Sequence, residues 1–92
     1  MPILMVADVQ GLPPEAARQV VESVVKPKIT SAPGFINHAS GPIDGGWRVT
    51  EAWHSRDDFE RWFQESITPA LPAGAEEAVQ ISVQDLEYVI ES

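Results

Sequence analysis

The residues with the clearest chemical potential lie in one predicted β-hairpin. His38 falls in the middle of the first strand, and an imidazole can act as a general acid or base near neutral pH. Glu51 falls in the middle of the second strand, where an unpaired carboxylate would be costly to bury. Asn37 and Arg48 carry donors that could hold an oxyanion formed on a bound molecule. Together these side chains suit the removal of a phenolic or α-carbonyl proton, with His38 or Glu51 as the base.

Each of these side chains also has a purely structural interpretation. His38 could be half-buried and hydrogen-bonded to a neighbouring group, since buried polar side chains are usually satisfied. Glu51 either faces a pocket, paired with His38 or Arg48, or forms an ion pair at an interface between two copies of the chain. Arg48 could hold an anionic substrate group or pair with an acidic side chain of its own chain.

The pairing of the two strands decides which residues lie beside His38. The turn between the strands contains the sequence Asp-Gly-Gly, which supplies the positive-φ positions of a hairpin. Its length fits a register that pairs His38 with Val49 or one that pairs it with Thr50. The first register places Glu51 on the same face as the histidine, and the second places Arg48 there.

Other reactive chemistries have little support in the sequence. The chain has no Cys, which excludes disulfides, thiolate metal sites, iron–sulfur clusters and a cysteine nucleophile. His38 and His54 lack the spacing of a metal site, so no metal is expected. The sequence has no Gly-rich phosphate loop that opens a helix and no nucleophile elbow, so neither nucleotide binding nor hydrolysis is expected.

Length and charge limit the partners of this chain. Its 92 residues predict one domain over residues 1–92. With 6 basic and 14 acidic residues, the net charge of −8 makes nucleic acid and anionic membranes poor partners. The apolar start is too short for a signal peptide and lacks a basic flank, so we expect a cytoplasmic location. A monomer of this size buries only about 60–65% of its unfolded surface, which favours a dimer.

Hydrophobic periodicity predicts six elements in the order β-α-β-β-α-β. Pro27 is expected to end the first helix, and Ser55 is expected to cap the second, which becomes irregular beyond Thr68. The last strand alternates in two registers, which a bulge near residues 84–85 would join. The predicted strands cover residues 3–9, 35–41, 47–53 and 79–90, and the predicted helices cover residues 14–26 and 56–68.

Aromatic side chains gather around the second predicted helix. Phe59, Trp62 and Phe63 share one face of this helix, and Trp53 ends the strand before it. This spacing is typical of core residues. In a fold this small the same helix face also lines any cavity, so these four side chains are expected to contact a bound small molecule.

The order of elements predicts an α+β, ferredoxin-like fold, in which a four-stranded antiparallel sheet carries two helices on one face. Apolar residues dominate the first strand, and large residues point to both faces of the third strand. Neither face of the sheet is therefore expected to meet water. We expect the sheet of a second copy to cover the open face.

Two motifs around the hairpin carry a family resemblance. The chain enters the hairpin through Pro-Gly-Phe at residues 33–35 and leaves it through the pattern V-x-E-x-W-x-S-x-x-x-F at residues 49–59. With the order of elements, these motifs resemble the antibiotic biosynthesis monooxygenase-like proteins of the dimeric α+β barrel superfamily. The resemblance implies a homodimer whose two sheets face each other, with the last strand reaching toward the partner and a pocket between each sheet and its helices. It also implies that oxygenation of quinols or anthrones needs no metal or organic cofactor.

Haem-degrading members of the same superfamily provide a contrast. Trp62 matches the tryptophan that they carry on the second helix. The histidine that they carry further along falls at or near Pro72, and their asparagine on the first strand falls at Ala7 or Asp8. The resemblance therefore argues against haem degradation.

Three hypotheses for function follow. The first is a homodimer that binds a small aromatic or polyketide-like molecule and acts as a cofactor-independent monooxygenase. The second is a non-catalytic binding or assembly module, which is expected if no cavity for a bicyclic ligand lies beside His38. The third is an isomerase or cyclase of the same fold, which needs a base but no O₂.

Overall fold

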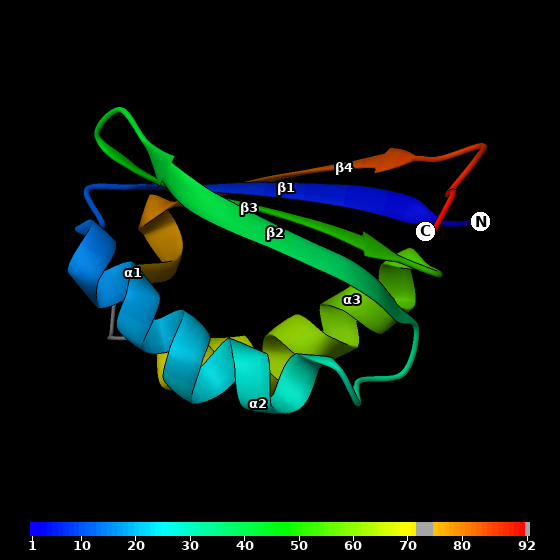
Figure 1. Cartoon of the computed structure of the whole chain (residues 1–92), viewed down its shortest axis with the longest axis horizontal. Coiled ribbons are helices and arrows are strands. Elements are labelled where there is room, and N and C mark those ends of the chain that lie inside the picture. The colour runs from blue at the N-terminus through cyan, green and yellow to red at the C-terminus, as the bar shows by residue number, and fades with distance from the viewer. Residues whose placement is uncertain (72–74, 92) are drawn as a thin grey trace.

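A four-stranded antiparallel sheet carries two helical segments on one face (Figure 1). The computed structural model describes residues 1–71 and 75–91. The strand order is β2-β3-β1-β4, which confirms the predicted α+β, ferredoxin-like arrangement. The strands are β1 (Ile3–Gln10), β2 (Phe35–Ile43), β3 (Gly46–Trp53) and β4 (Val79–Asp85). The helical elements are α1 (Pro14–Val20), η1 (Val21–Val25), α2 (Lys26–Ile29), α3 (Arg56–Trp62), η2 (Phe63–Ile67), η3 (Thr68–Ala70) and η4 (Ala75–Ala78).

The first helical segment continues through Pro27 to Ile29, so the predicted end before this proline is wrong. In η1 the backbone widens into a π-helical turn, and the Lys26 N–H bonds to the carbonyl of Val21, five residues earlier. Pro27 then stands in the first turn of α2, directly after the widened turn. The widened turn is therefore what allows the helix to pass the proline.

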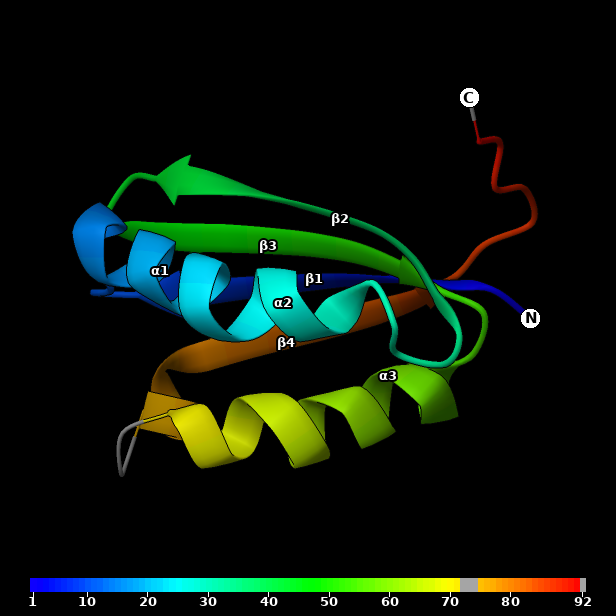
Figure 2. The ribbon, with the colours of Figure 1, turned by 60° about the horizontal axis from the view of Figure 1, so that its bottom comes forward.

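Ser55 begins the second helical segment, as predicted. Its hydroxyl oxygen accepts a hydrogen bond from the Asp58 N–H at 3.1 Å, and acidic side chains in the first turn complement the helix dipole. The segment passes through the π-helical turn η2 and closes in the short 3₁₀ turn η3, which confirms the irregular end beyond Thr68. Figure 2 shows this segment lying along the α1–α2 segment.

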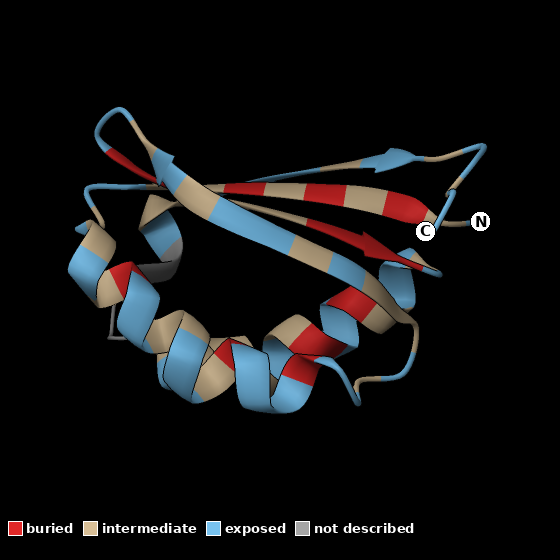
Figure 3. Cartoon of the chain, viewed as in Figure 1, coloured by how far each residue is buried: buried red, intermediate tan, exposed pale blue. Residues whose placement is uncertain are grey.

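Alternate side chains of β1 build the core. Ile3, Met5 and Ala7 point toward the helices and are buried, whereas Leu4 and Val6 on the other face are half-buried. The alternation is visible along β1 in Figure 3. The rest of the buried cluster comes from the helices and the end of β3, with Val25, Ile29, Trp53, Phe59 and Trp62. One face of the sheet is therefore packed, and the other is open.

The turn of the β2–β3 hairpin is shorter than the sequence predicts. Ile43 pairs with Gly46, so Asp44 and Gly45 alone form the turn. Gly45 takes a φ of +77°, which glycine adopts without a steric cost. The two strands are correspondingly longer than predicted.

This short turn sets the register of the hairpin. His38 stands opposite Glu51, so both predicted registers, with Val49 or Thr50 opposite the histidine, are wrong. Both registers are wrong because they assume a longer turn, in which the pairing of the two strands ends before Ile43 and Gly46. Of the two, the Val49 register places the correct side chains on the face of His38.

β4 ends at Asp85, so the single long strand predicted for residues 79–90 is wrong. Asp85 pairs with Ile3, the first residue of β1, and the Leu86 N–H then bonds to the carbonyl of Pro2 at 2.8 Å. Because β1 offers no further residues to pair with, the chain turns away from the sheet (Figure 2). The expected bulge is replaced by the end of the strand.

Candidate functional site

Glu51 is a buried charged residue in the middle of β3. It is 4% exposed and lies on the face of the sheet that the helices cover. Its Oε2 lies 2.7 Å from His38 Nδ1, and its Oε1 accepts a hydrogen bond from the Trp53 indole N–H at 3.0 Å. Because both oxygens have partners, hydrogen bonds compensate the burial of this carboxylate. Of the pairings that the sequence leaves open, the structure shows the one with His38.

The hydrogen bonds of His38 define its tautomer. A carboxylate only accepts hydrogen bonds, so Nδ1 carries the proton that points to Glu51. In the neutral ring Nε2 is then an acceptor, and the hydroxyl of Ser40 lies 2.9 Å from it. The His38 side chain keeps 15% of its surface exposed. His38 therefore has an acceptor nitrogen, Nε2, that contacts the exposed Ser40.

A β-bulge places His38 on the face of the sheet toward the helices. Phe35 pairs with Trp53, and the register shifts by one residue between Phe35 and Asn37. Phe35 and His38, three residues apart, consequently face the same side. Phe35 packs edge-on against Trp53, with ring centroids 5.6 Å apart.

Trp53 connects the polar pair to the aromatic core. It is fully buried, and its ring centroid lies 6.2 Å from those of Phe59 and Trp62. Phe63 packs against Phe59, with centroids 5.9 Å apart. The structure thus brings together the four aromatic residues predicted to contact a ligand, and Trp53 leaves no surface free for one.

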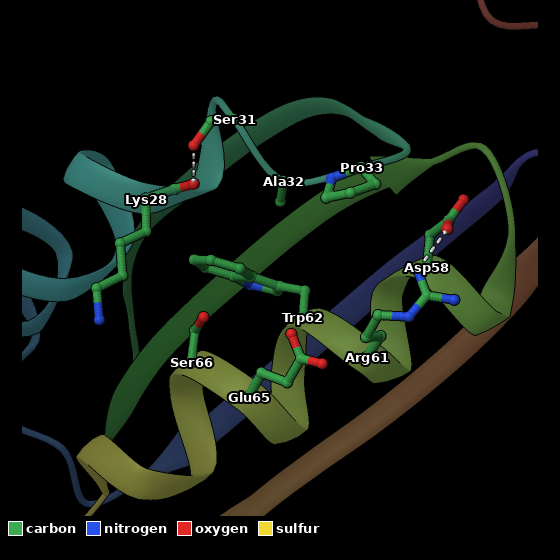
Figure 4. A pocket seen from close by; sticks show the side chains of 9 residues that line it. All are labelled: Lys28, Ser31, Ala32, Pro33, Asp58, Arg61, Trp62, Glu65 and Ser66. Atoms are coloured by element: carbon green, nitrogen blue, oxygen red, sulfur yellow. Dashed lines mark hydrogen bonds and ion pairs between the residues drawn. The ribbon is translucent and has the colours of Figure 1, made fainter.

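A small hollow lies between α3 and the loop that leads from α2 to β2 (Figure 4). Its volume is about 160 Å³, and Trp62 lies at its centre among polar side chains. Lys28 and Arg61 bring positive charge to it, and Asp58 and Glu65 bring negative charge. Its charges therefore favour neither anionic nor cationic ligands.

A larger groove of about 430 Å³ lies between α3, η2 and β4. Its apolar lining comes from Phe59 and Phe63 on the helical segment and from Ile81 and Val83 on the strand. Polar side chains of α3 and η2 form its rim. His38 lines neither this groove nor the hollow at Trp62.

Arg48 and Asn37 lie on the open face of the sheet, away from His38, because side chains alternate along a strand. Arg48 donates two hydrogen bonds to the Asp8 carboxylate, at 2.7 and 2.8 Å. These bonds lower the pKa of Asp8 and raise that of Arg48 from their usual values. Asn37 Oδ1 accepts a hydrogen bond from the Ala52 N–H at 3.3 Å. The two residues predicted to hold an oxyanion are therefore not brought to His38.

Two residues near this site were not among the candidates predicted from the sequence. Ser40 contacts His38 Nε2, and the spacing His-x-Ser on a strand, which places both side chains on one face, could have indicated it. Trp47 is 6% exposed, and its indole N–H has no hydrogen-bond partner among residues 1–71 and 75–91. No pattern in the sequence indicates that an indole lacks a partner.

The described part of the chain contains no group of three metal-ligating side chains. None of its helices has the length and hydropathy needed to span a membrane. Of the positions that bear on haem degradation, Ala7 is buried toward the helices and Asp8 lies on the open face, paired with Arg48. Pro72 lies outside the described residues.

No family model matches the chain, and no curated protein matches its sequence. Solved structures match over almost its whole length. Rv0793 from Mycobacterium tuberculosis has a TM-score of 0.70 at 18% identity and covers 100% of this chain and 99% of its own. SnoaB from Streptomyces nogalater, described as a cofactor-independent oxygenase, has a TM-score of 0.67 at 11% identity. Its match covers 99% of this chain and 97% of the SnoaB chain. The haem-degrading protein MhuD from Mycobacterium tuberculosis, with two haems bound, has a TM-score of 0.62 at 17% identity. Its match covers 97% of this chain and 99% of the MhuD chain.

The chain shares the fold of these solved structures. The resemblance predicted from the hairpin motifs is thereby confirmed at the level of the fold. Identities of 11–18% establish no shared chemistry, so the function is argued from the residues of this chain. In this fold, the pair of His38 and Glu51 lies on the face of the sheet that carries the helices.

Proposed function

We propose that this protein is a homodimer that binds a small, electron-rich aromatic molecule and oxygenates it without a cofactor. The observation that carries the proposal is the buried Glu51 carboxylate held 2.7 Å from His38 Nδ1, which leaves Nε2 as the base. A histidine oriented by a buried carboxylate is an arrangement that general bases use. The likeness in fold to SnoaB, described as a cofactor-independent oxygenase, supports the same class of reaction.

His38 performs the proton transfer in this proposal. Nε2 takes the acidic proton of a quinol or an anthrone, and Glu51 stabilises the imidazolium that forms. The resulting anion is electron-rich enough to react with O₂ directly. For an anthrone, one O₂ is consumed, the ring CH₂ becomes a carbonyl and one water is released. The Trp53 indole holds the second oxygen of Glu51, so the carboxylate keeps its orientation during the transfer.

Binding without catalysis is the second candidate function. It is the function expected when no cavity lies beside His38, and His38 lines neither the larger groove nor the hollow at Trp62. The groove lined by Phe59 and Phe63 borders β4, whereas His38 stands on β2 at the opposite edge of the sheet. Its volume of about 430 Å³ falls within the range of about 300–1,000 Å³ that is usual for small-molecule sites. A ligand held in this groove would lie out of reach of His38.

Dithranol, a 1,8-dihydroxyanthrone, is the probe that separates these candidates. Oxygen uptake and formation of the anthraquinone are followed for the wild type and for His38→Asn and His54→Ala. Asparagine keeps an N–H donor for Glu51 but lacks Nε2, so we expect the rate to fall at least about 100-fold. His54 is exposed, and its alanine variant is expected to match the wild type.

The outcomes of this assay differ between the hypotheses. If His38→Asn oxidised dithranol at the wild-type rate, and faster than dithranol autoxidises in buffer, the role of His38 would be contradicted. Saturable binding of dithranol without oxidation, lost in Phe63→Ala, would establish the binding module. Exchange of the anthrone methylene protons with deuterated water, without oxygen uptake, would support an isomerase.

The open face of the sheet supports the homodimer. Leu4 and Val6 on this face are half-buried, and the C-terminal tail carries Tyr88 and Ile90 at 80% and 93% exposure. Apolar surface of this kind is unfavourable in water unless a partner covers it. A second copy that packs its sheet on this face would bury Leu4 and Val6 and give the tail a surface to contact.

Val6→Asp tests the dimer, because it places a charge in the middle of the face that the partner would cover. Size-exclusion chromatography with light scattering should show a dimer for the wild type and a monomer for this variant. Gln64→Asp introduces the same charge on an exposed helix position and is expected to remain a dimer. A wild type that stays monomeric at high micromolar concentration would contradict the proposal.

A further inference from the structure

Ser40 forms a second reactive arrangement with the same histidine. Its Oγ lies 2.9 Å from His38 Nε2, while Nδ1 of this ring lies 2.7 Å from the buried Glu51 carboxylate. We propose that Ser40, His38 and Glu51 form a nucleophile–base–carboxylate triad that hydrolyses small carboxylic esters. Ser40 is the nucleophile, His38 the base, and Glu51 the group that orients the base.

The donor and acceptor roles along this triad are set by chemistry. Glu51 only accepts, so His38 Nδ1 donates to it, and Nε2 accepts the hydroxyl proton of Ser40. A serine hydroxyl is a weak nucleophile until a base within hydrogen-bond reach takes its proton. The carboxylate holds the ring in the required tautomer and stabilises the imidazolium. The same three roles act together in serine hydrolases of unrelated folds.

The hairpin explains how these three side chains meet. His38 and Ser40 are two residues apart on β2, so they share a face, and Glu51 stands directly opposite His38 on β3. β2 is an edge strand of the sheet, and Ser40 is exposed. A small ester can therefore reach Oγ from solvent without displacing a core side chain.

The reaction balances with water as the co-substrate. Ser40 Oγ bonds to the carbonyl carbon as its proton passes to His38 Nε2. The C–O bond to the alcohol breaks, and Nε2 gives the proton to the leaving oxygen. Water then attacks the acyl-serine and gives a proton to Nε2, and the bond to Oγ breaks as Oγ regains that proton. One ester and one water yield one carboxylic acid and one alcohol.

A fluorophosphonate label and p-nitrophenyl acetate test the triad in the full chain. Mass spectrometry of the digested wild type should place one phosphonyl group on Ser40, with loss of fluoride. Hydrolysis should fall at least about 100-fold in Ser40→Ala and in His38→Asn, because each removes a group on which proton transfer depends. Ser40 is exposed, so its alanine variant should stay folded, which circular dichroism checks. Ser23→Ala changes an exposed serine on the first helical segment, away from the triad, and should match the wild type.

Three results would overturn the triad. The first is a wild type that is not labelled and hydrolyses the ester no faster than buffer. The second is equal hydrolysis by Ser40→Ala, which would mean that the imidazole attacks the ester itself. The third is a label that remains at full yield in Ser40→Ala.

The two assays test the proposed oxygenase activity and the proposed hydrolase activity independently. Dithranol oxidation by a protein that the fluorophosphonate does not label would leave the oxygenase and overturn the triad. Labelling of Ser40 in a protein that does not oxidise dithranol would support the triad and contradict the oxygenase.

Discussion

Replacing His38 by alanine tests how far the fold depends on its pair with Glu51. The substitution leaves Glu51 Oε2 without the partner that lies 2.7 Å away, in a residue that is 4% exposed. Removing one partner of a buried pair costs about 3–5 kcal/mol of folding free energy. The His38 side chain is 15% exposed, so water can replace part of the lost interaction, and we expect about 3 kcal/mol.

His38→Asn is the matched comparison, because its amide N–H can still donate to Glu51. We expect a loss of about 1 kcal/mol for this variant, the size of a weakened hydrogen bond. The difference of about 2 kcal/mol between the two variants then measures the cost of leaving the carboxylate without a partner.

Urea denaturation at neutral pH and fixed protein concentration, followed by tryptophan fluorescence, measures both losses. With a slope of about 1.2 kcal/mol per M, the midpoint should fall by about 2.5 M for alanine and by about 0.8 M for asparagine. Midpoints of both variants within about 0.3 M of the wild type would refute the reasoning, because Glu51 would then not depend on His38.

Three further predictions concern the backbone and the open face. Gly34→Ala should lower the urea midpoint more than Gly11→Ala does. Both positions have a positive φ, +84° at Gly34 and +78° at Gly11, but an added Cβ would meet a side chain only at Gly34. Equal losses in the two variants would refute this. Ser55→Ala should cost about 1 kcal/mol in the same assay by removing the cap of α3, and an unchanged midpoint would contradict the capping role. Arg48→Gln should raise the pKa of Asp8 toward its usual value in an NMR titration, and an unchanged pKa would contradict the cause assigned here. Because the folded pKa of Asp8 is lowered, the pair stabilises the protein above the usual aspartate pKa, and this contribution is lost as the pH falls through the lowered value.

The local features of the fold were predictable from the residues. The apolar run of β1 and the helical spacing around Phe59 and Trp62 indicated the order of elements, because hydrophobic period distinguishes strand from helix. The cap at Ser55 was predictable for a similar reason, since it depends on residues only three apart. Pro27 misled because the proline rule assumes α-helical geometry, which the π-helical turn η1 relaxes.

The candidate site was predictable in part. His38, Glu51 and the aromatic residues could be named from their types and positions, and the pairing of the first two was one of the alternatives. The position of Arg48 was not predictable, because one residue of register moves a side chain to the opposite face of the sheet. Ser40 has no loop motif that would mark it as a nucleophile, because it lies within the edge strand β2.

The sequence by itself determined the types of element, their order and the class of the fold, because these follow from composition and from contacts between near neighbours in the chain. Only the tertiary structure decided that the hairpin turn has two residues, and with it that His38 meets Glu51 and Ser40 while Arg48 meets Asp8 on the other face. Register is set by the conformation of the turn and by packing between strands distant in sequence. A local pattern contains neither of these.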